Sequence, residues 1–288
     1  MKKVFAMLMT LTLALSLLAG CGSSQETTED TTGTDDTQTE ETQLSGSVST
    51  DGSTSMEEVI GALGEQFQAD TGVSVTYNPT GSGSGIEAVK NGSCDIGLSS
   101  RALKDEEKAA GLTETTVALD GIAIIVNAEN PVTDLSIDQI AQIYTGAVTD
   151  WADMGGTAGT IAVIGRESGS GTRDGFEDIV KVKDACQYDV TLNSTGAVVS
   201  KVMSDANAIG YVSYSAVSDE IKALKVGGVE INDDNIADKS YALQRPFVHA
   251  YLKNTDNELV QAYLQFLQTD EAQNIMKKDK LIPQEFWK

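Results

Sequence analysis

The chain has 288 residues and a formal net charge of −23 at pH 7, with 43 acidic residues against 20 lysines and arginines. This acidic balance argues against a nucleic-acid partner, because proteins bind phosphate backbones through Lys and Arg. It leaves a small anion open as a ligand, because local dipoles and one or two positive groups can hold such an anion whatever the net charge.

The first residues have the pattern of an export signal. Two lysines precede an apolar run from Val4 to Ala19, which is typical of a secretory signal peptide over residues 1–20. The run ends in Leu-Ala-Gly-Cys at residues 18–21, which resembles the lipobox of bacterial lipoproteins. That resemblance implies lipid attachment at Cys21 and a location on the outer face of the cell membrane. The alternative is an ordinary signal peptide followed by an unrelated cysteine.

Residues 21–44 are expected to form a disordered, acidic, Thr-rich tether between the lipid and the folded part. The segment has seven acidic residues after Cys21 and almost nothing apolar, so it cannot bury enough surface to offset its chain entropy. Two other cysteines follow in the chain, Cys94 and Cys186. They are interpreted as separate buried thiols, with a disulfide between them as the alternative.

From residue 45 onward, strand-like and helix-like patterns alternate. Alternating or continuous apolar runs predict strands, and apolar spacing of three and four residues predicts helices. This alternation indicates an α/β fold. The strands are predicted at residues 73–77, 95–98, 121–126, 160–164 and 210–214, and the helices at residues 56–69, 137–144 and 259–276.

Four loops are rich in Gly, Ser and Thr, and three or four of them lie just after a strand and just before a helix. They lie at residues 50–56, 80–85, 98–101 and 165–173. A helix start leaves about four backbone N–H groups unpaired and carries partial positive charge, so it attracts anions. Glycine permits close approach of the backbone, and hydroxyls both donate and accept hydrogen bonds. The four loops together predict a site for a tetrahedral oxyanion.

The fourth loop carries the strongest signal, because Arg166 precedes a Ser-Gly-Ser-Gly-Thr run ahead of a helix. An arginine adds a fixed charge whose planar fork matches two oxygens of the anion. Both arginines of this loop also have acidic neighbours in the sequence. Arg166 could instead pair with Glu167 or another acid, and Arg173 is expected to face solvent or to pair with Asp174 or Glu177.

Several segments resemble, in the same order, the phosphate-binding proteins of bacterial ABC transporters. The resemblance implies a two-lobed periplasmic-binding-protein-like fold of type II, with phosphate in the cleft between the lobes. Lobe 1 is expected at residues 45–126 and 221–288, and lobe 2 at residues 127–220. The segments are residues 52–56, 81–86, 95–101, 142–146, 165–172, 196–199 and 208–212.

The resemblance also implies which residues contact the ligand. Ser100 departs from the relatives that have an aspartate there to accept the proton of hydrogen phosphate, although a hydroxyl can also accept that proton. Arg101 is typical of a subgroup. The residues implied are Thr54, Ser55, Ser82, Ser100, Arg101, Arg166, Ser170, Gly171 and Thr172.

The function implied is that of the extracellular substrate-binding component of an ABC importer, a monomer that delivers inorganic phosphate to permease and ATPase subunits. Binding of sulfate or molybdate, and a phosphate sensor or adhesin on the same fold, remain alternatives. An enzyme such as a secreted phosphatase is not expected, because the sequence has neither a Gly-x-Ser-x-Gly elbow nor metal-ligand spacing, and His249 is the only histidine. No cofactor or metal is expected.

Overall fold

The computed structural model describes residues 44–283, and residues 42–288 form one compact unit. The signal peptide expected at residues 1–20, the lipidation site expected at Cys21 and nearly all of the tether lie outside the described residues. Among the helices of residues 44–283, none combines the length and the apolar character needed to cross a membrane.

Most strands belong to one ten-stranded sheet, and β9 (Ile221–Ala223) and β12 (Ile282–Pro283) attach to its long strand β4. A second sheet pairs β5 (Asp134–Leu135) with β10 (Lys225–Val226). The main path runs in the order β2 (Ser74–Pro79), β1 (Ser47–Gly52), β3 (Ile96–Ser99), β11 (Gln244–Leu252), β4 (Leu112–Asn127), β8 (Ala208–Ser213), β6 (Ala162–Arg166) and β7 (Val190–Leu192).

Several helices start where a polar side chain caps them, as at α4, where Ser136 and Gln139 form a reciprocal capping box. Short 3₁₀ turns precede some of the helices and strands. The helical elements are η1 (Thr54–Met56), α1 (Glu57–Thr71), α2 (Ser82–Lys90), α3 (Asp105–Ala109), α4 (Ile137–Tyr144), η2 (Trp151–Met154), α5 (Gly171–Val180), α6 (Thr195–Ser204), η3 (Tyr214–Ala216), α7 (Asp233–Ala237), α8 (Glu258–Phe266) and α9 (Asp270–Lys278).

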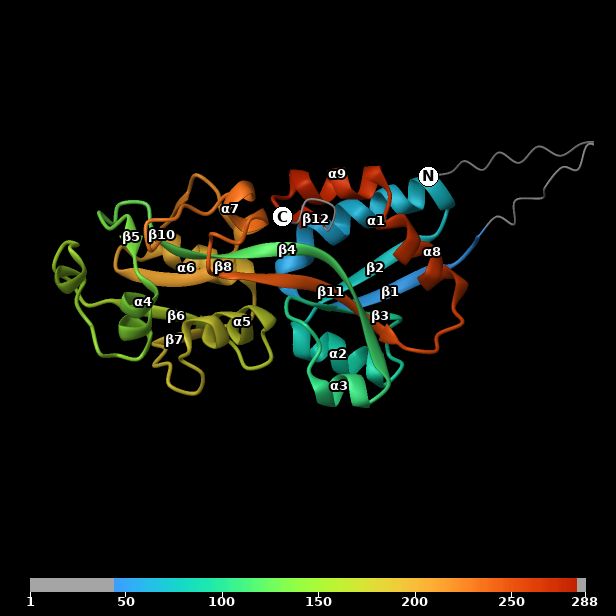
Figure 1. The fold of residues 1–288 in the computed structure, drawn as a ribbon, viewed down its shortest axis with the longest axis horizontal. Coiled ribbons are helices and arrows are strands. Elements are labelled where there is room, and N and C mark those ends of the chain that lie inside the picture. Colours follow the sequence, from blue (N-terminus) through green and yellow to red (C-terminus); the bar gives the residue numbers. More distant parts are fainter. Residues whose placement is uncertain (1–43, 284–288) are drawn as a thin grey trace, which may run out of the picture. The chain divides into compact units, whose positions relative to one another are not determined.

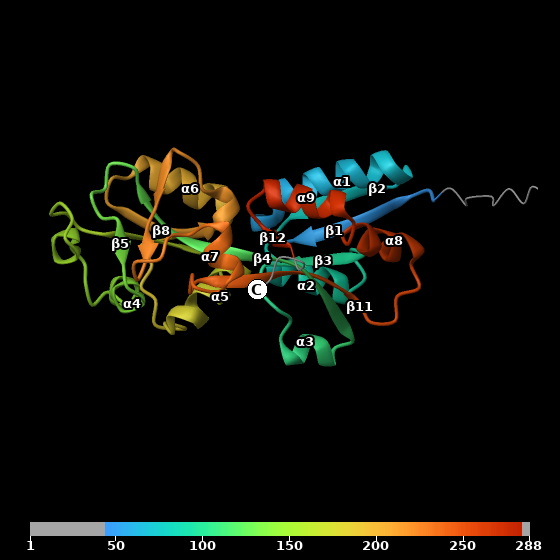
Figure 2. The ribbon, with the colours of Figure 1, turned by 45° about the horizontal axis from the view of Figure 1, so that its top comes forward.

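Two large apolar cores define two lobes on this sheet, and a smaller third cluster includes Ile86 and Val89 of α2. The first core contains Val48, Leu63, Phe67 and Phe247, and the second contains Ile125, Tyr144, Trp151 and Tyr241. In the first lobe, α1 and α9 lie on one side of the strands, and α2 and α3 lie on the other (Figures 1 and 2). In the second lobe, α6 lies opposite α4 and α5 (Figures 1 and 2).

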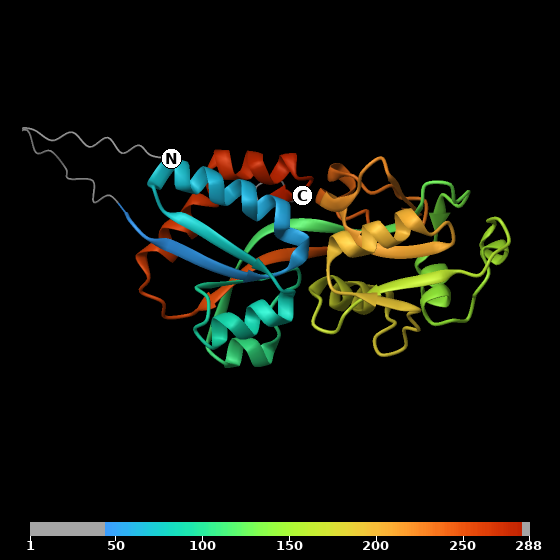
Figure 3. The same cartoon turned by 180° about the vertical axis from the view of Figure 1, so that it is seen from behind.

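The strands β4 and β11 connect the lobes. Residues 112–121 of β4 pair with β11, whereas residues 122–126 pair with β8 in the second lobe. The apolar core changes over the same stretch, because Ala118 belongs to the first core and Ile122 to the second. The two strands run side by side between the lobes, and the view from behind shows the same arrangement (Figures 1 and 3). The stretch where β4 and β11 pass from one lobe to the other therefore lies next to elements of both lobes.

The lobe boundary expected between residues 220 and 221 does not coincide with the boundary between the two apolar cores. Ile221, Leu224, Ile231 and Leu243 all lie in the second core, whereas Phe247 lies in the first. The segment after residue 220 remains in the second lobe because β9 pairs with the second-lobe end of β4. The chain returns to the first lobe only along β11.

Two other expectations about the elements are corrected by the structure. The closing helix predicted at residues 259–276 is two helices, α8 and α9, because Thr269 caps a new helix that begins at Asp270. The strand predicted at residues 121–126 is the second part of β4, whose first part is only half-buried and lacks a continuous apolar run. The helix predicted at residues 137–144 is confirmed as α4.

Candidate functional site

Hydroxyl groups from both lobes meet between them. The Ser55 hydroxyl oxygen lies 2.9 Å from that of Thr172 and 3.3 Å from that of Thr195. The Thr54 hydroxyl oxygen lies 3.2 Å from that of Thr195. All four side chains are buried. Ser55 and Thr54 come from the 3₁₀ turn ahead of α1, whereas Thr172 and Thr195 come from the second lobe, so the cluster joins the two faces of the cleft.

The second-lobe hydroxyls stand at helix starts. Ser170 caps α5 by accepting from the backbone N–H of Arg173, and Thr172 is the second residue of that helix. Thr195 is the first residue of α6, behind the capping residue Ser194. Both helices direct the positive end of the helix dipole toward this region, and the backbone N–H of Thr195 donates to the Thr54 hydroxyl at 3.3 Å. The arrangement therefore favours an anion between the loops.

On the opposite face, Ser82 opens α2 and contacts the loop after β3. The Ser82 hydroxyl accepts from the backbone N–H of Ser100 at 3.1 Å and lies 3.2 Å from the Ser100 hydroxyl oxygen. Both hydroxyls face Gly171, where an added Cβ would lie 2.5 Å from Ser82 Oγ and 2.7 Å from Ser100 Oγ. A backbone hydrogen bond of 2.9 Å from Gly83 to Gly169 also joins the two lobes. Glycine at position 171 is thus required for the close approach of the two faces.

The Arg166 side chain is only 3% exposed and contacts both the hydroxyl cluster and an acidic residue. Its Nε and Nη2 donate to the two carboxylate oxygens of Glu167 at 2.9 Å each. Its Nη1 donates to the Thr195 hydroxyl at 3.4 Å. The pairing with Glu167 was one of the alternatives from the sequence. The structure contains this pairing and the contact to the hydroxyl cluster together, because Nε and Nη2 of Arg166 donate to Glu167 while Nη1 donates to Thr195.

A layer of polar residues behind the loop fixes the backbone of Arg166. Its N–H donates to the Tyr211 hydroxyl at 3.1 Å, and its carbonyl accepts from Arg173 at 3.1 Å. Arg173 also pairs with Glu177 at 2.7 Å, as expected, and Tyr188 donates to the same Glu177 oxygen at 2.9 Å. Arg166 is therefore held at both its side chain and its backbone.

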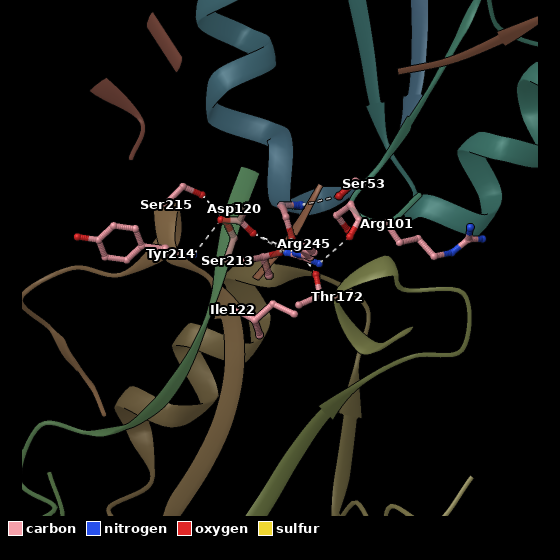
Figure 4. A network of polar contacts seen from close by, with 12 residues as sticks. Ser53, Arg101, Asp120, Ile122, Thr172, Ser213, Tyr214, Ser215 and Arg245 are labelled. Carbon is pink, nitrogen blue, oxygen red and sulfur yellow. Dashed lines mark hydrogen bonds and ion pairs between the residues drawn. The ribbon is translucent and has the colours of Figure 1, made fainter. Parts of the chain in front are cut away.

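A second arginine lies at the junction of the lobes. Arg245 of β11 donates to Asp120 of β4 from Nε at 3.1 Å and from Nη2 at 2.9 Å. It also donates to the Ser55 hydroxyl at 3.3 Å and to the Ser100 carbonyl at 3.2 Å. Figure 4 shows Arg245 between Asp120 and Thr172, with its guanidinium directed toward the cluster.

Burial and pairing act in opposite directions on this ion pair. Burial raises the pKa of Asp120, and the donors Arg245, Ser213 and Tyr214 oppose that rise. Burial lowers the pKa of Arg245, which the carboxylate of Asp120 opposes and the nearby Arg166 guanidinium reinforces. Both carboxylate oxygens accept hydrogen bonds, Oδ2 from Arg245 and Oδ1 from the Ser213 hydroxyl at 2.7 Å. The full set of donors favours the ionised pair.

The sequence and the fold have counterparts among known proteins. A model of the PBP superfamily domain matches residues 37–271. The phosphate-binding protein PstS of Staphylococcus epidermidis is 31% identical over 252 residues, which cover 80% of this chain and 77% of that protein. PstS of Bacillus subtilis is 28% identical over 285 residues, covering 97% and 94%. The chain belongs to the PBP superfamily and to its PstS family.

Solved structures agree with the PstS family assignment. The chain is similar to a structure from Clostridium perfringens, described as a phosphate ABC transporter substrate-binding protein with bound phosphate. The identity is 42% and the TM-score 0.80, with 82% of this chain and 99% of that chain covered. An ABC-type phosphate transport receptor from Vibrio cholerae is 31% identical at a TM-score of 0.68, with 82% and 99% covered. The two-lobed α/β fold expected from the sequence is confirmed.

The structure brings together eight of the nine residues that the PstS resemblance implied, and it places Arg101 elsewhere. The Arg101 guanidinium pairs with Glu107 at 2.8 Å and with Asp174 at 2.9 Å. Its side chain extends away from Arg245 and Thr172 (Figure 4). Arg101 is therefore removed from the candidate ligand set. The residues that remain are Thr54, Ser55, Ser82, Ser100, Arg166, Ser170, Gly171 and Thr172.

Three residues of the cluster had not been predicted. Thr195 follows the N-cap of α6, a position that has no glycine-rich loop, and its only sequence signal is the Ser-Thr-Gly run before a helix. Arg245 and Asp120 face each other in register on β11 and β4. Arg245 is the only Lys, Arg, Asp or Glu of β11, but β4 contains Glu114 as well as Asp120, so the sequence does not single out the pair.

The remaining reactive side chains lie outside the cluster. Cys94 and Cys186 are both free thiols, as expected, and burial raises the pKa of each to about 11. His249 lies fully buried in β11, where burial lowers its pKa to about 3. None of these three residues contributes to the hydroxyl cluster described above.

Proposed function

We propose that this protein is the extracellular substrate-binding component of an ABC importer, and that it captures inorganic phosphate between its two lobes. The observation that carries the proposal is the buried cluster of hydroxyls from both lobes, at the starts of α5 and α6 and beside Arg166. Donors that converge from two lobes fit an anion that is enclosed when the lobes close. The PstS relatives and the phosphate-bound relative support the choice of phosphate.

The cluster provides the chemistry that a partly protonated oxyanion requires. Hydroxyl groups can donate to the ionised oxygens and accept from a protonated one. Arg166 supplies fixed positive charge, and the helix starts supply backbone N–H groups. Ser100 is the residue on which selectivity depends most, because it provides an acceptor for the phosphate proton without a carboxylate. Sulfate and molybdate remain the competing ligands.

The ligand is tested by calorimetric titration of the purified protein with phosphate, followed by competition with sulfate, arsenate and molybdate. The proposal expects phosphate to bind at micromolar concentration and to resist displacement by an equal concentration of sulfate. Tighter binding of sulfate or molybdate would assign the site to another oxyanion.

The transport role places the protein on the outer face of the cell membrane, held by lipid at Cys21, as a monomer that docks on permease and ATPase subunits. The lipobox-like residues 18–21 and the PstS relatives support this arrangement. Binding and release alone are proposed, without a chemical step. Uptake of labelled phosphate by a deletion strain tests the role. Unchanged uptake, with phosphate binding intact in the purified protein, would favour a sensor or adhesin.

A further inference from the structure

We propose that Arg245 is a second cationic ligand of the anion site and that Asp120 is the residue that positions it. This inference rests on the proposed function, because it assigns a further residue to the same site. The sequence-based ligand set included Arg101 and Arg166 as its cations, and the structure replaces the first of these with an arginine from the connecting strand β11.

Arg245 is buried and makes several hydrogen bonds, unlike an arginine on the protein surface. Its side chain is 2% exposed and that of Asp120 is fully buried. An arginine has five N–H donors. Within residues 44–283, two donate to Asp120 Oδ2, one to the Ser55 hydroxyl and one to the Ser100 carbonyl, which leaves one N–H on Nη1. The group thus touches two of the three first-lobe loops and keeps a donor beside them.

The position of Arg245 complements that of Arg166. A chain of polar contacts links them, from Arg245 to Ser55, from Ser55 to Thr195 at 3.3 Å and from Thr195 to Arg166. The two guanidinium groups are close enough that Arg166 disfavours the charge on Arg245. Two positive groups that face each other across a hydroxyl cluster are stabilised by an anion between them.

Asp120 orients Arg245 through a network of its own. Its Oδ2 receives both donors from Arg245, and its Oδ1 receives the Ser213 hydroxyl and, at 3.2 Å, the Tyr214 backbone N–H. Figure 4 shows Tyr214 on the side of Asp120 away from Thr172 and Arg245 on the side toward Thr172. The carboxylate therefore holds the Nε and Nη2 edge of the guanidinium, and Nη1 lies on the side toward the cleft.

Arg245 and Arg166 also belong to different faces of the cleft. Arg245 contacts the loops of Ser55 and Ser100, whereas Arg166 belongs to the second-lobe loop before α5. The first-lobe face therefore has a cation of its own before the second lobe contributes Arg166. This arrangement predicts that Arg245 acts mainly on the association rate of the anion, because fixed charge steers encounter.

The decisive variant is the double substitution Arg245→Gln with Asp120→Asn, which removes both charges together. The single variant Arg245→Gln would leave a buried carboxylate without its partner, which destabilises the fold. The neutral pair retains a hydrogen-bonding group at each position, and Asn has the same shape as Asp. The measurements are the dissociation constant for phosphate by calorimetry, the association rate by stopped flow and the free energy of unfolding without phosphate.

The proposal expects the folded double variant to bind phosphate about 10- to 100-fold more weakly than the wild type, as for loss of a hydrogen bond to a charged group. Most of the change is expected in the association rate. Arg245→Lys, which keeps the charge but not the planar fork, is expected to lose less. Wild-type affinity in a folded double variant would overturn the proposal and assign the pair to stability alone.

A matched control replaces another ion pair of the first lobe, Lys108→Gln with Glu114→Gln. These two side chains pair at 2.8 Å on the surface of the first lobe, with Lys108 47% exposed. The control removes one positive and one negative charge, and its affinity is expected to stay within about twofold of wild type. If the wild type itself failed to bind phosphate, the proposed function would fail first. Loss only in the Arg245 variants supports the further inference.

Discussion

The Ser55 and Thr172 hydroxyl oxygens lie 2.9 Å apart although 117 residues separate them in the chain. Ser55 belongs to the turn that precedes α1 in the first lobe, and Thr172 belongs to the first turn of α5 in the second. The two faces of the cleft therefore meet through side chains that can each bind an anion. Every substitution that changes this meeting point is expected to change binding more than stability.

Thr172→Val is expected to weaken phosphate binding by about 10- to 100-fold, because it removes one donor to a charged ligand while keeping the shape of the side chain. The dissociation constant from calorimetry checks the prediction. The control is Thr191→Val, which makes the same chemical change on the exposed strand β7. Equal affinities for the two variants would remove Thr172 from the site.

Gly171→Ala is expected to weaken phosphate binding by about tenfold or more, because the added methyl group would collide with two hydroxyls of the opposite lobe. Its Cβ would lie 2.5 Å from Ser82 Oγ and 2.7 Å from Ser100 Oγ. The stability of the ligand-free protein is expected to change little if the lobes can separate. Small-angle scattering with and without phosphate measures whether the variant still closes.

The control for that prediction is Gly61→Ala on the exposed face of α1, where an added Cβ meets no atom within 4 Å. This change is expected to raise the free energy of unfolding by up to about 1 kcal/mol, because alanine favours a helix over glycine. Phosphate binding is expected to be unchanged. Impaired closure in both variants would mean that the contact at position 171 is not the cause.

Tyr211→Phe is expected to lower the free energy of unfolding by about 1–3 kcal/mol, because the buried N–H of Arg166 loses its acceptor. The ring remains, so the stacking of Phe176 on this side chain at 4.2 Å is preserved. Phosphate affinity is expected to fall as well, because the same N–H fixes the loop of Arg166. Chemical denaturation and calorimetry measure the two effects separately.

Tyr251→Phe serves as the control for Tyr211, because its hydroxyl lies 3.1 Å from that of Thr115 in a half-buried position of the first lobe. It is expected to affect stability slightly and phosphate affinity not at all. An unchanged affinity in Tyr211→Phe would contradict a role for Tyr211 in positioning Arg166.

The loops of the candidate site were predictable because their residue types are chosen by local chemistry. Ser82, Ser170 and Thr172 lie at helix starts, where glycine and hydroxyl residues leave a clear pattern in the sequence. Arg245 has no such pattern, because its role depends on the register that places it opposite Asp120 across two strands. A contact set by strand pairing between distant segments is not visible in a single sequence.

For Arg101, the sequence pattern predicted a ligand residue, but the structure shows no contact between its side chain and the hydroxyl cluster. Its neighbours in the sequence resemble a ligand loop, yet Glu107 and Asp174 pair with its guanidinium. Asp174 lies on α5, 73 residues away, so the competing partner appears only in the fold.

The closing helix at residues 259–276 was predicted as a single helix because apolar spacing continues through residue 269, although Thr269 caps a new helix. A partner distant in the sequence decided the case of Arg101, and a local capping residue decided the case of the closing helix.

The stability of the protein is expected to fall as the pH rises through the range from about 4 to about 7, in part because of Asp279. Burial, reinforced by the charge of Glu58, raises the pKa of this carboxyl from 3.8 to about 7. Within that range the native state keeps the proton while the unfolded state has released it. The free energy of unfolding therefore decreases with pH, by at most about 1.4 kcal/mol per pH unit for one group.

Asp279→Asn is expected to flatten this slope and to raise the free energy of unfolding at pH 8 relative to the wild type. Urea denaturation at pH 5, 6, 7 and 8 measures the slope for both proteins. Glu65→Gln, on the exposed face of α1, removes a charge from the same region and is expected to leave the slope unchanged. A slope in Asp279→Asn equal to that of the wild type would contradict the assignment.

The most direct test of the central claim is a calorimetric titration of phosphate into the wild-type protein beside Arg166→Ala. The account predicts that the wild type binds one phosphate per chain with a dissociation constant of about 1 µM or tighter, equivalent to about −8 kcal/mol. Arg166→Ala is predicted to bind at least about tenfold more weakly, because it removes the charged donor beside Thr195. Absence of phosphate binding by the wild type at micromolar concentrations, or equal affinities for the two proteins, would contradict the account.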